Sequence, residues 1–212
     1  MDKMDLDFRK LDSHKLFDFS KEEEKLIFEI YDKLFELYNI SVVNIEDSLY
    51  PKFSSDIENP FSLFIPKICY FITDKDKKHS FYLFVVSKIQ KTWKGGKMPV
   101  EYDTLQLWGL KDIHEDFGYI SITKKKLIDK IAGMFSNFTI NFKDRDFKDF
   151  YVLGSDKFKA MAFLTSKRKE CIKNFPDENF QLEIKNSILS FGLPKILTAE
   201  NAILISKFVE EI

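Results

Sequence analysis

The residues best suited to holding a metal ion are grouped in one short segment, Asp112-Ile113-His114-Glu115-Asp116. Carboxylate oxygens and one imidazole could together bind a divalent ion. Successive residues seldom converge on one ion without a defined loop geometry, so we interpret the segment as a solvated turn. None of the three histidines has a cysteine or a second histidine at ligand spacing. The sequence therefore predicts neither a metal site nor a cofactor.

Nucleophilic catalysis would need a cysteine or serine beside a histidine with an orienting acid. The two cysteines, Cys69 and Cys171, lie in apolar surroundings without a flanking glycine or an electropositive element. The sequence contains no nucleophile elbow, no phosphate-binding loop and no glycine-rich dinucleotide turn. The pattern favours a protein that is not an enzyme. An enzyme with an unfamiliar site, for example around His114, stays open as an alternative.

A basic and aromatic segment is the candidate for binding nucleic acid. Residues 61–97 carry eight lysines against two aspartates. Lysines on strands and hairpin tips could follow a phosphate backbone, while an exposed ring stacks on a base. Because lysines at sheet edges also guard against aggregation, a solubilising role is the alternative. The candidate residues are Lys75, Lys77, Lys78, Lys91, Trp93, Lys94 and Lys97.

An acidic N-terminal segment is the candidate for binding another protein. Residues 1–60 carry fifteen acids against eight bases, although the whole chain has a net charge of only −1. Within this segment we expect an acidic helix face of Glu29, Asp32 and Glu36, with Tyr31 and Tyr38 as aromatic anchors. The partner would be a protein with a basic surface. A toxin-neutralising immunity protein, bound to a basic toxin, is one form of this hypothesis.

The clearest element that positions these residues is a helix over residues 21–38. Ser20 and Glu23 form a capping box, in which each side chain accepts a hydrogen bond from an otherwise unpaired backbone N–H. Apolar residues then recur at helical spacing along one stripe, with charged residues opposite. Phe28 and Phe35 lie off the main stripe, so the helix is apolar on more than one side.

Short runs of β-branched and aromatic residues, separated by polar turns, follow this helix. We expect strands at 41–45, 63–72, 81–90, 104–110, 119–122, 138–142, 151–153, 180–185 and 187–191. Further helices should begin after Thr123, after Thr165 and after Thr198. The predicted fold is α+β: a mixed, mainly antiparallel sheet of short strands, an N-terminal amphipathic helix and two or three further helices. One domain spans 1–212, with a helical segment over 1–40 and a sheet-rich body over 41–212 that ends in helices.

The segment from Phe147 to Thr165 resembles a bacterial family known as domain of unknown function 3137. It has spaced phenylalanines, Val152 in a strand, Asp156, Ala160 four residues later, and Leu164-Thr165 opening a helix. The strands that contain residues 107–110 and 182–191 are also similar to those of the family. The resemblance covers about half of the chain and implies a fold, with no reaction. We interpret Asp156 as a residue that caps or turns the chain.

The chain start and the cysteine usage indicate the compartment. Residues 1–14 lack the apolar stretch of a signal peptide, and no window approaches the roughly 20 apolar residues that span a bilayer. Two distant cysteines do not make a disulfide framework. We therefore expect a cytoplasmic bacterial protein with no membrane span.

Overall fold

The structure, a computed structural model, describes residues 19–54, 62–92, 100–125 and 147–212. Its helices are α1 (Lys21–Leu37), α2 (Tyr50–Ser54), α3 (Lys157–Phe163), α4 (Ser166–Asn174) and α5 (Ala199–Glu211), with a 3-10 helix η3 (Ile45–Asp47). Its strands are β1 (Asn39–Val43), β2 (Ser62–Thr73), β3 (Ser80–Thr92), β4 (Val100–Asp112), β5 (Tyr119–Lys124), β6 (Phe150–Gly154), β7 (Gln181–Lys185) and β8 (Ile188–Gly192). The helix expected after Thr123 and the strand at 138–142 lie outside the described residues.

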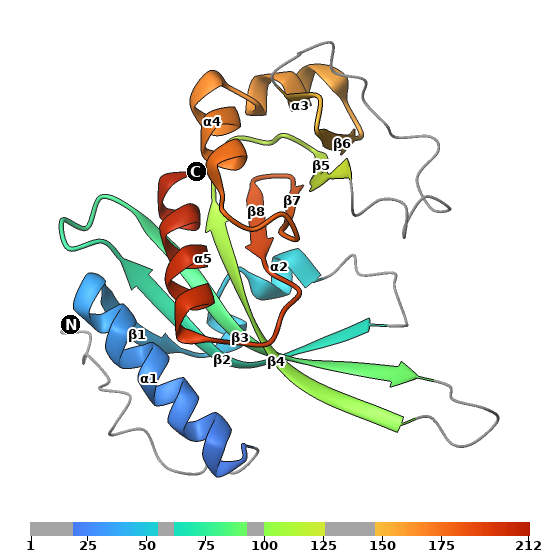
Figure 1. Ribbon diagram of the computed structural model, residues 1–212. Helices are drawn as coiled ribbons and strands as arrows, with labels where there is room; N and C mark the ends of the chain where they lie inside the picture. The colour runs from blue at the N-terminus through green and yellow to red at the C-terminus, as the bar shows by residue number, and fades with distance from the viewer. Residues whose placement is uncertain (1–18, 55–61, 93–99, 126–146) are drawn as a thin grey trace.

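These strands form one sheet in the order β1-β2-β3-β4-β8-β7-β5-β6. Every neighbouring pair is antiparallel. Strands β1 to β4 follow one another along the chain and across the sheet, whereas the late hairpin β7–β8 enters between β4 and β5 (Figure 1). The predicted α+β class with a mainly antiparallel sheet is confirmed.

Helix α1 begins where its sequence predicts. The Glu23 carboxylate accepts from the Ser20 backbone N–H at 2.8 Å, and the Glu23 N–H donates to the Ser20 hydroxyl at 3.3 Å. These two bonds complete a capping box. Its buried stripe consists of Ile27, Ile30, Tyr31 and Leu34.

The sheet has an apolar layer on each face. Helices α1 and α5 pack together on the first face, over a core that includes Leu34, Leu83 and Val209. Segment η3–α2 lies on the second face, where the Tyr50 ring is 5.6 Å from the Phe84 ring and Cys69 is buried. The aromatic and apolar run of β3 is therefore covered on both sides, as its lack of alternation predicts.

Helix α5 lies against β4 with almost no free space. A Cβ atom at Gly109 would be 2.6 Å from the Val209 side chain, which is shorter than any ordinary carbon contact. The Lys111 ammonium, on the same strand, donates to the Glu210 carbonyl near the end of α5 at 2.8 Å. A residue without a side chain at position 109 thus allows the helix to approach the sheet closely.

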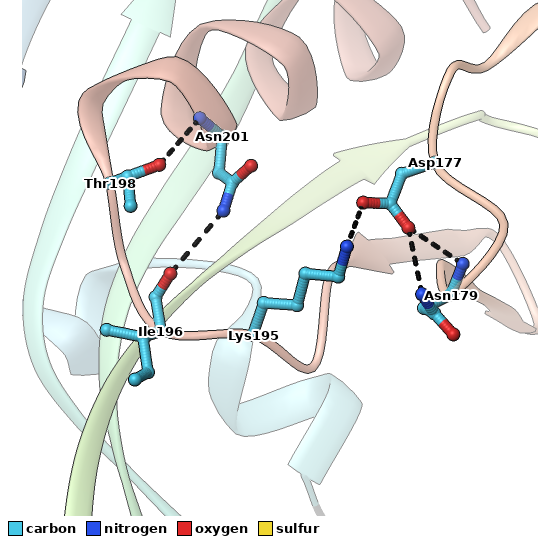
Figure 2. Close-up of polar contacts among 6 residues, drawn as sticks. All are labelled: Asp177, Asn179, Lys195, Ile196, Thr198 and Asn201. Atoms are coloured by element: carbon cyan, nitrogen blue, oxygen red, sulfur yellow. Dashed lines mark hydrogen bonds and ion pairs between the residues drawn. The ribbon is translucent and has the colours of Figure 1, made fainter.

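The segment that enters α5 is fixed by polar contacts at its start. The Lys195 ammonium forms an ion pair with the Asp177 carboxylate (Figure 2). The other Asp177 oxygen accepts from the backbone N–H of Asn179 at 2.9 Å and from its side-chain amide at 3.2 Å. The turn before β7 and the turn after β8 are therefore tied to each other.

The same segment is fixed at its end by the cap of α5. The Thr198 hydroxyl accepts from the Asn201 N–H at 3.1 Å, which confirms that Thr198 caps the final helix (Figure 2). The Leu197 N–H donates to the Leu105 carbonyl on β4 at 2.8 Å. These bonds hold α5 in register with the strand beneath it.

Candidate protein-binding surface

The three predicted acidic residues of α1 lie on its outer side. Glu29, Asp32 and Glu36 are all exposed. Glu29 forms an ion pair with Lys33 one turn later, with 3.0 Å between Nζ and Oε1. Since α1 contains six acids and three lysines, its outer side keeps a net negative charge.

The two predicted anchors, Tyr31 and Tyr38, lie in the core instead. Their side chains are only 5% and 3% exposed. The Tyr31 ring is 6.1 Å from the Tyr70 ring, and the Tyr38 hydroxyl donates to the Glu210 carboxylate at 2.8 Å. Both tyrosines hold α1 on the sheet and on α5, so neither is available to a partner. Their place in the helical stripe already indicates burial.

Two other apolar side chains of α1 are exposed. Phe35 is 55% exposed and Leu37 is 39% exposed. Phe35 lies beside Asp32, and Asp32 lies beside Glu36, because residues three or four apart are neighbours on a helix surface. Leu37, two residues after Phe35, faces another side of the helix. We call Asp32, Phe35 and Glu36 the α1 patch. The sequence signal for Phe35 was its position off the main stripe.

The Phe35 ring is held by its neighbours although half of its surface is exposed. It stacks on Tyr31 with ring centroids 6.0 Å apart and an interplanar angle of 17°. The Lys75 ammonium lies 5.5 Å from the ring centroid. The ring therefore has a defined orientation before any partner binds.

Lys75, predicted as a nucleic-acid contact, has a structural role in this fold. Its ammonium donates to the carbonyls of Phe35 at 3.0 Å and Tyr38 at 2.9 Å. Helix α1 has no basic residue in its last turn, so Lys75 supplies the positive charge that a helix C-terminus favours. Lys77 and Lys78 lie nearby in the β2–β3 turn, where Lys78 pairs with Asp76 at 3.1 Å.

The other predicted nucleic-acid contacts fall on residues or side chains that the structure does not describe. Trp93, Lys94 and Lys97 lie outside the described residues. Lys91 belongs to β3, and its side chain is outside the described part of the chain. The structure thus brings together only the β2–β3 turn of this candidate interface, and there one of three lysines is already used by α1.

The segment around His114 is an exposed turn. His114 has a positive φ of 62°, and its N–H donates to the Asp112 carboxylate at 2.8 Å. Asp116 accepts from the Gly118 N–H, and this bond together with the Lys159 ammonium lowers the pKa of Asp116. Over residues 19–54, 62–92, 100–125 and 147–212, no cluster of three or more His, Cys, Asp or Glu residues could hold a metal ion.

Asp156 caps a helix that the sequence did not predict. Its carboxylate accepts from the N–H groups of Phe158 at 2.7 Å and Lys159 at 3.1 Å at the start of α3. The interpretation of Asp156 as a capping residue is confirmed.

Neither cysteine has the surroundings of a nucleophile. Both thiols are free and buried. Burial raises the pKa of Cys69 to about 12 and that of Cys171 to about 11. A buried thiol with a raised pKa contributes little thiolate at neutral pH.

Glu183 is a largely buried carboxyl group that sequence reasoning missed. It faces the second side of the sheet between Ser121 and Ser190, its partners in register on β5 and β8. Burial raises the pKa of Glu183, and the Lys185 ammonium partly offsets this. Alternation along β7 already puts Glu183 on the other face of the sheet from Leu182 and Ile184. It does not indicate that the face carrying Glu183 is also covered.

A groove of about 450 Å³ lies between α4 and α5. Its floor includes Phe175 and Phe208, and its rim has Lys167 and Lys207 beside acidic residues. The volume is within the range of small-molecule sites. Because the lining carries both basic and acidic residues, the groove does not select one class of charged ligand.

No protein-family model, no curated protein and no solved structure matches the chain. The resemblance to domain of unknown function 3137 stays a prediction. Among the described helices, none combines the length and the apolar character required to cross a lipid bilayer.

Proposed function

We propose that the protein binds another protein through the α1 patch, and that the partner presents a basic surface with an apolar pocket. The exposure of Phe35, a large ring with acidic neighbours on an otherwise well-packed helix, carries this proposal. Large exposed apolar groups with a polar rim are typical of protein interaction sites. In the proposed site Phe35 is therefore the anchor, in place of the two buried tyrosines.

Charge supports the choice of a basic partner. Glu22, Glu29, Asp32 and Glu36 are exposed along α1. Acidic groups around an interface accelerate encounter with a positively charged partner and disfavour a negatively charged one. The acidic face would thus set the association rate and the choice of partner, while Phe35 would slow dissociation of the complex.

The fixed orientation of Phe35 supports its role as an anchor. Its ring is already held by Tyr31 and Lys75, so binding would immobilise little additional side-chain freedom. Interfaces draw most of their affinity from a few such preorganised aromatic residues.

The test is capture of partners by the tagged full chain from its host at low salt. The wild type would be compared with Phe35→Ser and with the double charge reversal Asp32→Lys/Glu36→Lys. We expect the basic partner to be lost with both variants. The charge reversal should mainly slow association with the purified partner, and Phe35→Ser should mainly speed dissociation.

The matched control is Glu200→Lys, which reverses an exposed acid in the first turn of α5. This variant should retain the partner. If Glu200→Lys and the α1 variants lose the partner equally, the binding depends on net charge and the α1 patch is not the site. If Phe35→Ser retains full affinity, the anchor role is wrong.

The immunity form of this proposal adds one expectation. A captured partner that is a toxin should arrest growth when it is expressed alone, and co-expression of the wild-type chain should restore growth. Phe35→Ser should fail to restore it at the same protein level. A partner that is harmless alone would exclude the immunity form and leave the protein-binding function in place.

A further inference from the structure

The surface of α3 and α4 combines exposed apolar side chains with a strong basic charge. Residues 157–174 include six basic residues and a single acid, Glu170. Phe158 is 81% exposed and Met161 is 52% exposed. Both values are unusual for side chains of this size in a folded protein, where large apolar groups are mostly buried.

The two apolar side chains lie on the same side of α3. They are three residues apart, and such residues neighbour each other on a helix surface. The opposite side of α3 packs inward through Ala160 and Phe163, which are fully buried. The orientation of α3 is therefore set by the core, and the core leaves Phe158 and Met161 pointing outward.

Five of the six basic residues of this segment divide into an inner and an outer set, and the sixth, Lys169, is partly buried. Lys159 pairs with Asp116 at 3.1 Å. Arg168 points inward, with its guanidinium 4.6 Å from the Phe163 ring centroid and its Nη1 donating to the Phe163 carbonyl. The outer set consists of Lys157, Lys167 and Lys173, which are exposed. We call Lys157, Phe158, Met161, Lys167 and Lys173 the α3–α4 surface.

We propose that the α3–α4 surface docks the protein onto an anionic lipid bilayer. Phe158 and Met161 would enter the boundary between headgroups and acyl chains, and the three lysines would lie near the lipid phosphates. Interfacial helices combine these two features: apolar groups, aromatic rings among them, on one side and lysines around them. Each lysine near an anionic leaflet adds to the attraction.

Two observations favour a bilayer over other anionic partners. An arginine guanidinium suits paired contacts to a single phosphate group. The arginine of this segment, Arg168, instead packs against the rings of Phe117 and Phe163. The outer lysines act as point charges, which suit a diffuse anionic surface. In addition, Phe158 stands out from its helix, and a fluid bilayer accepts a protruding ring without a matching pocket.

The α3–α4 surface and the α1 patch lie at different ends of the molecule. Figure 1 has α3 and α4 at the top of the view and α1 at the lower left. Docking through the α3–α4 surface would therefore leave the α1 patch free. The bilayer proposal does not depend on the proposed function, and each can fail alone.

The test is flotation of the full chain with vesicles. Vesicles of phosphatidylcholine mixed with phosphatidylserine should carry the protein, whereas vesicles of phosphatidylcholine alone should not. Neutralising Lys157 or Lys167 to glutamine should weaken partition about fivefold for each lysine. Phe158→Ser should weaken it about tenfold, since the ring no longer leaves water. Added salt should weaken the binding of the wild type.

Lys77→Gln, in the β2–β3 turn, and Phe35→Ser, on α1, are the matched controls and should float like the wild type. All variants change exposed side chains, and circular dichroism verifies that each is folded. Equal flotation with both vesicle types, or full flotation of Phe158→Ser, would overturn the proposal. The surface would be assigned to nucleic acid instead if the protein did not float with either vesicle type but bound a labelled oligonucleotide, and if this binding required Lys157 and Lys167.

Discussion

The ammonium of Lys75 donates a 2.9 Å hydrogen bond to the carbonyl oxygen of Tyr38, the residue at which α1 ends. We expect Lys75→Met to destabilise the protein by about 1 kcal/mol, because α1 loses the cation at its C-terminus. Urea unfolding followed by circular dichroism measures this. Lys77→Met is the control, and it should unfold like the wild type. Equal stability of both variants would show that the contact does not stabilise the fold.

The hydrogen bond between Tyr38 and Glu210 joins α1 to α5. Burial raises the pKa of Tyr38, and the bond to the Glu210 carboxylate raises it further, so the phenol remains a donor up to strongly alkaline pH. Tyr38→Phe should cost about 1–2 kcal/mol of unfolding free energy. A double-mutant cycle with Glu210→Ala should give a coupling energy above about 0.5 kcal/mol. Additive effects would contradict a direct interaction.

The contact between Gly109 and α5 leaves no room for a methyl group. We expect Gly109→Ala to destabilise the protein by about 1–3 kcal/mol, since the added Cβ would force α5 away from β4. Thermal unfolding measures the loss. In a Val209→Ala background, which removes the clashing methyl group, the same substitution should cost clearly less. An equal cost in both backgrounds would mean that strain arises elsewhere.

Glu183 should make stability fall as the pH rises. Its folded-state pKa lies above the ordinary value of 4.5, so the folded protein holds this proton more tightly than the unfolded chain. The corresponding stability is complete below that ordinary value and is lost as the pH rises through the raised pKa. Glu183→Gln should remove this loss. Urea unfolding across the pH range tests it, and a variant that loses stability as steeply as the wild type would refute the assignment.

Local chemistry made part of this fold predictable. The Ser20–Glu23 capping box and the Thr198 cap each involve residues three apart, so the sequence alone indicates where α1 and α5 begin. Residue alternation indicates most of the strands in the same way. The order of the strands was not predictable, because the pair Trp108 and Gly192 depends on residues far apart in the chain.

The candidate sites were predictable only in part. The acidic face of α1 follows from helical spacing, but Tyr31 and Tyr38 were assigned to the surface although they belong to its apolar stripe. The exposure of Phe158 follows from the way α3 packs on the core, and no local sequence pattern predicts how α3 packs. The basic character of residues 157–174 could have been found in the sequence, since a short window reveals a local charge that the net charge of −1 of the whole chain conceals.

The insertion of β7–β8 between β4 and β5 has a consequence for the growing polypeptide. A ribosome delivers residues 1–124 while the facing edges of β4 and β5 still lack their neighbours, which are residues 181–192. Open edges of this kind can recruit strands from other nascent chains. The interval between synthesis of β5 and of β8 is therefore the period in which this protein most needs a chaperone, and truncation before residue 181 should produce aggregates that sediment.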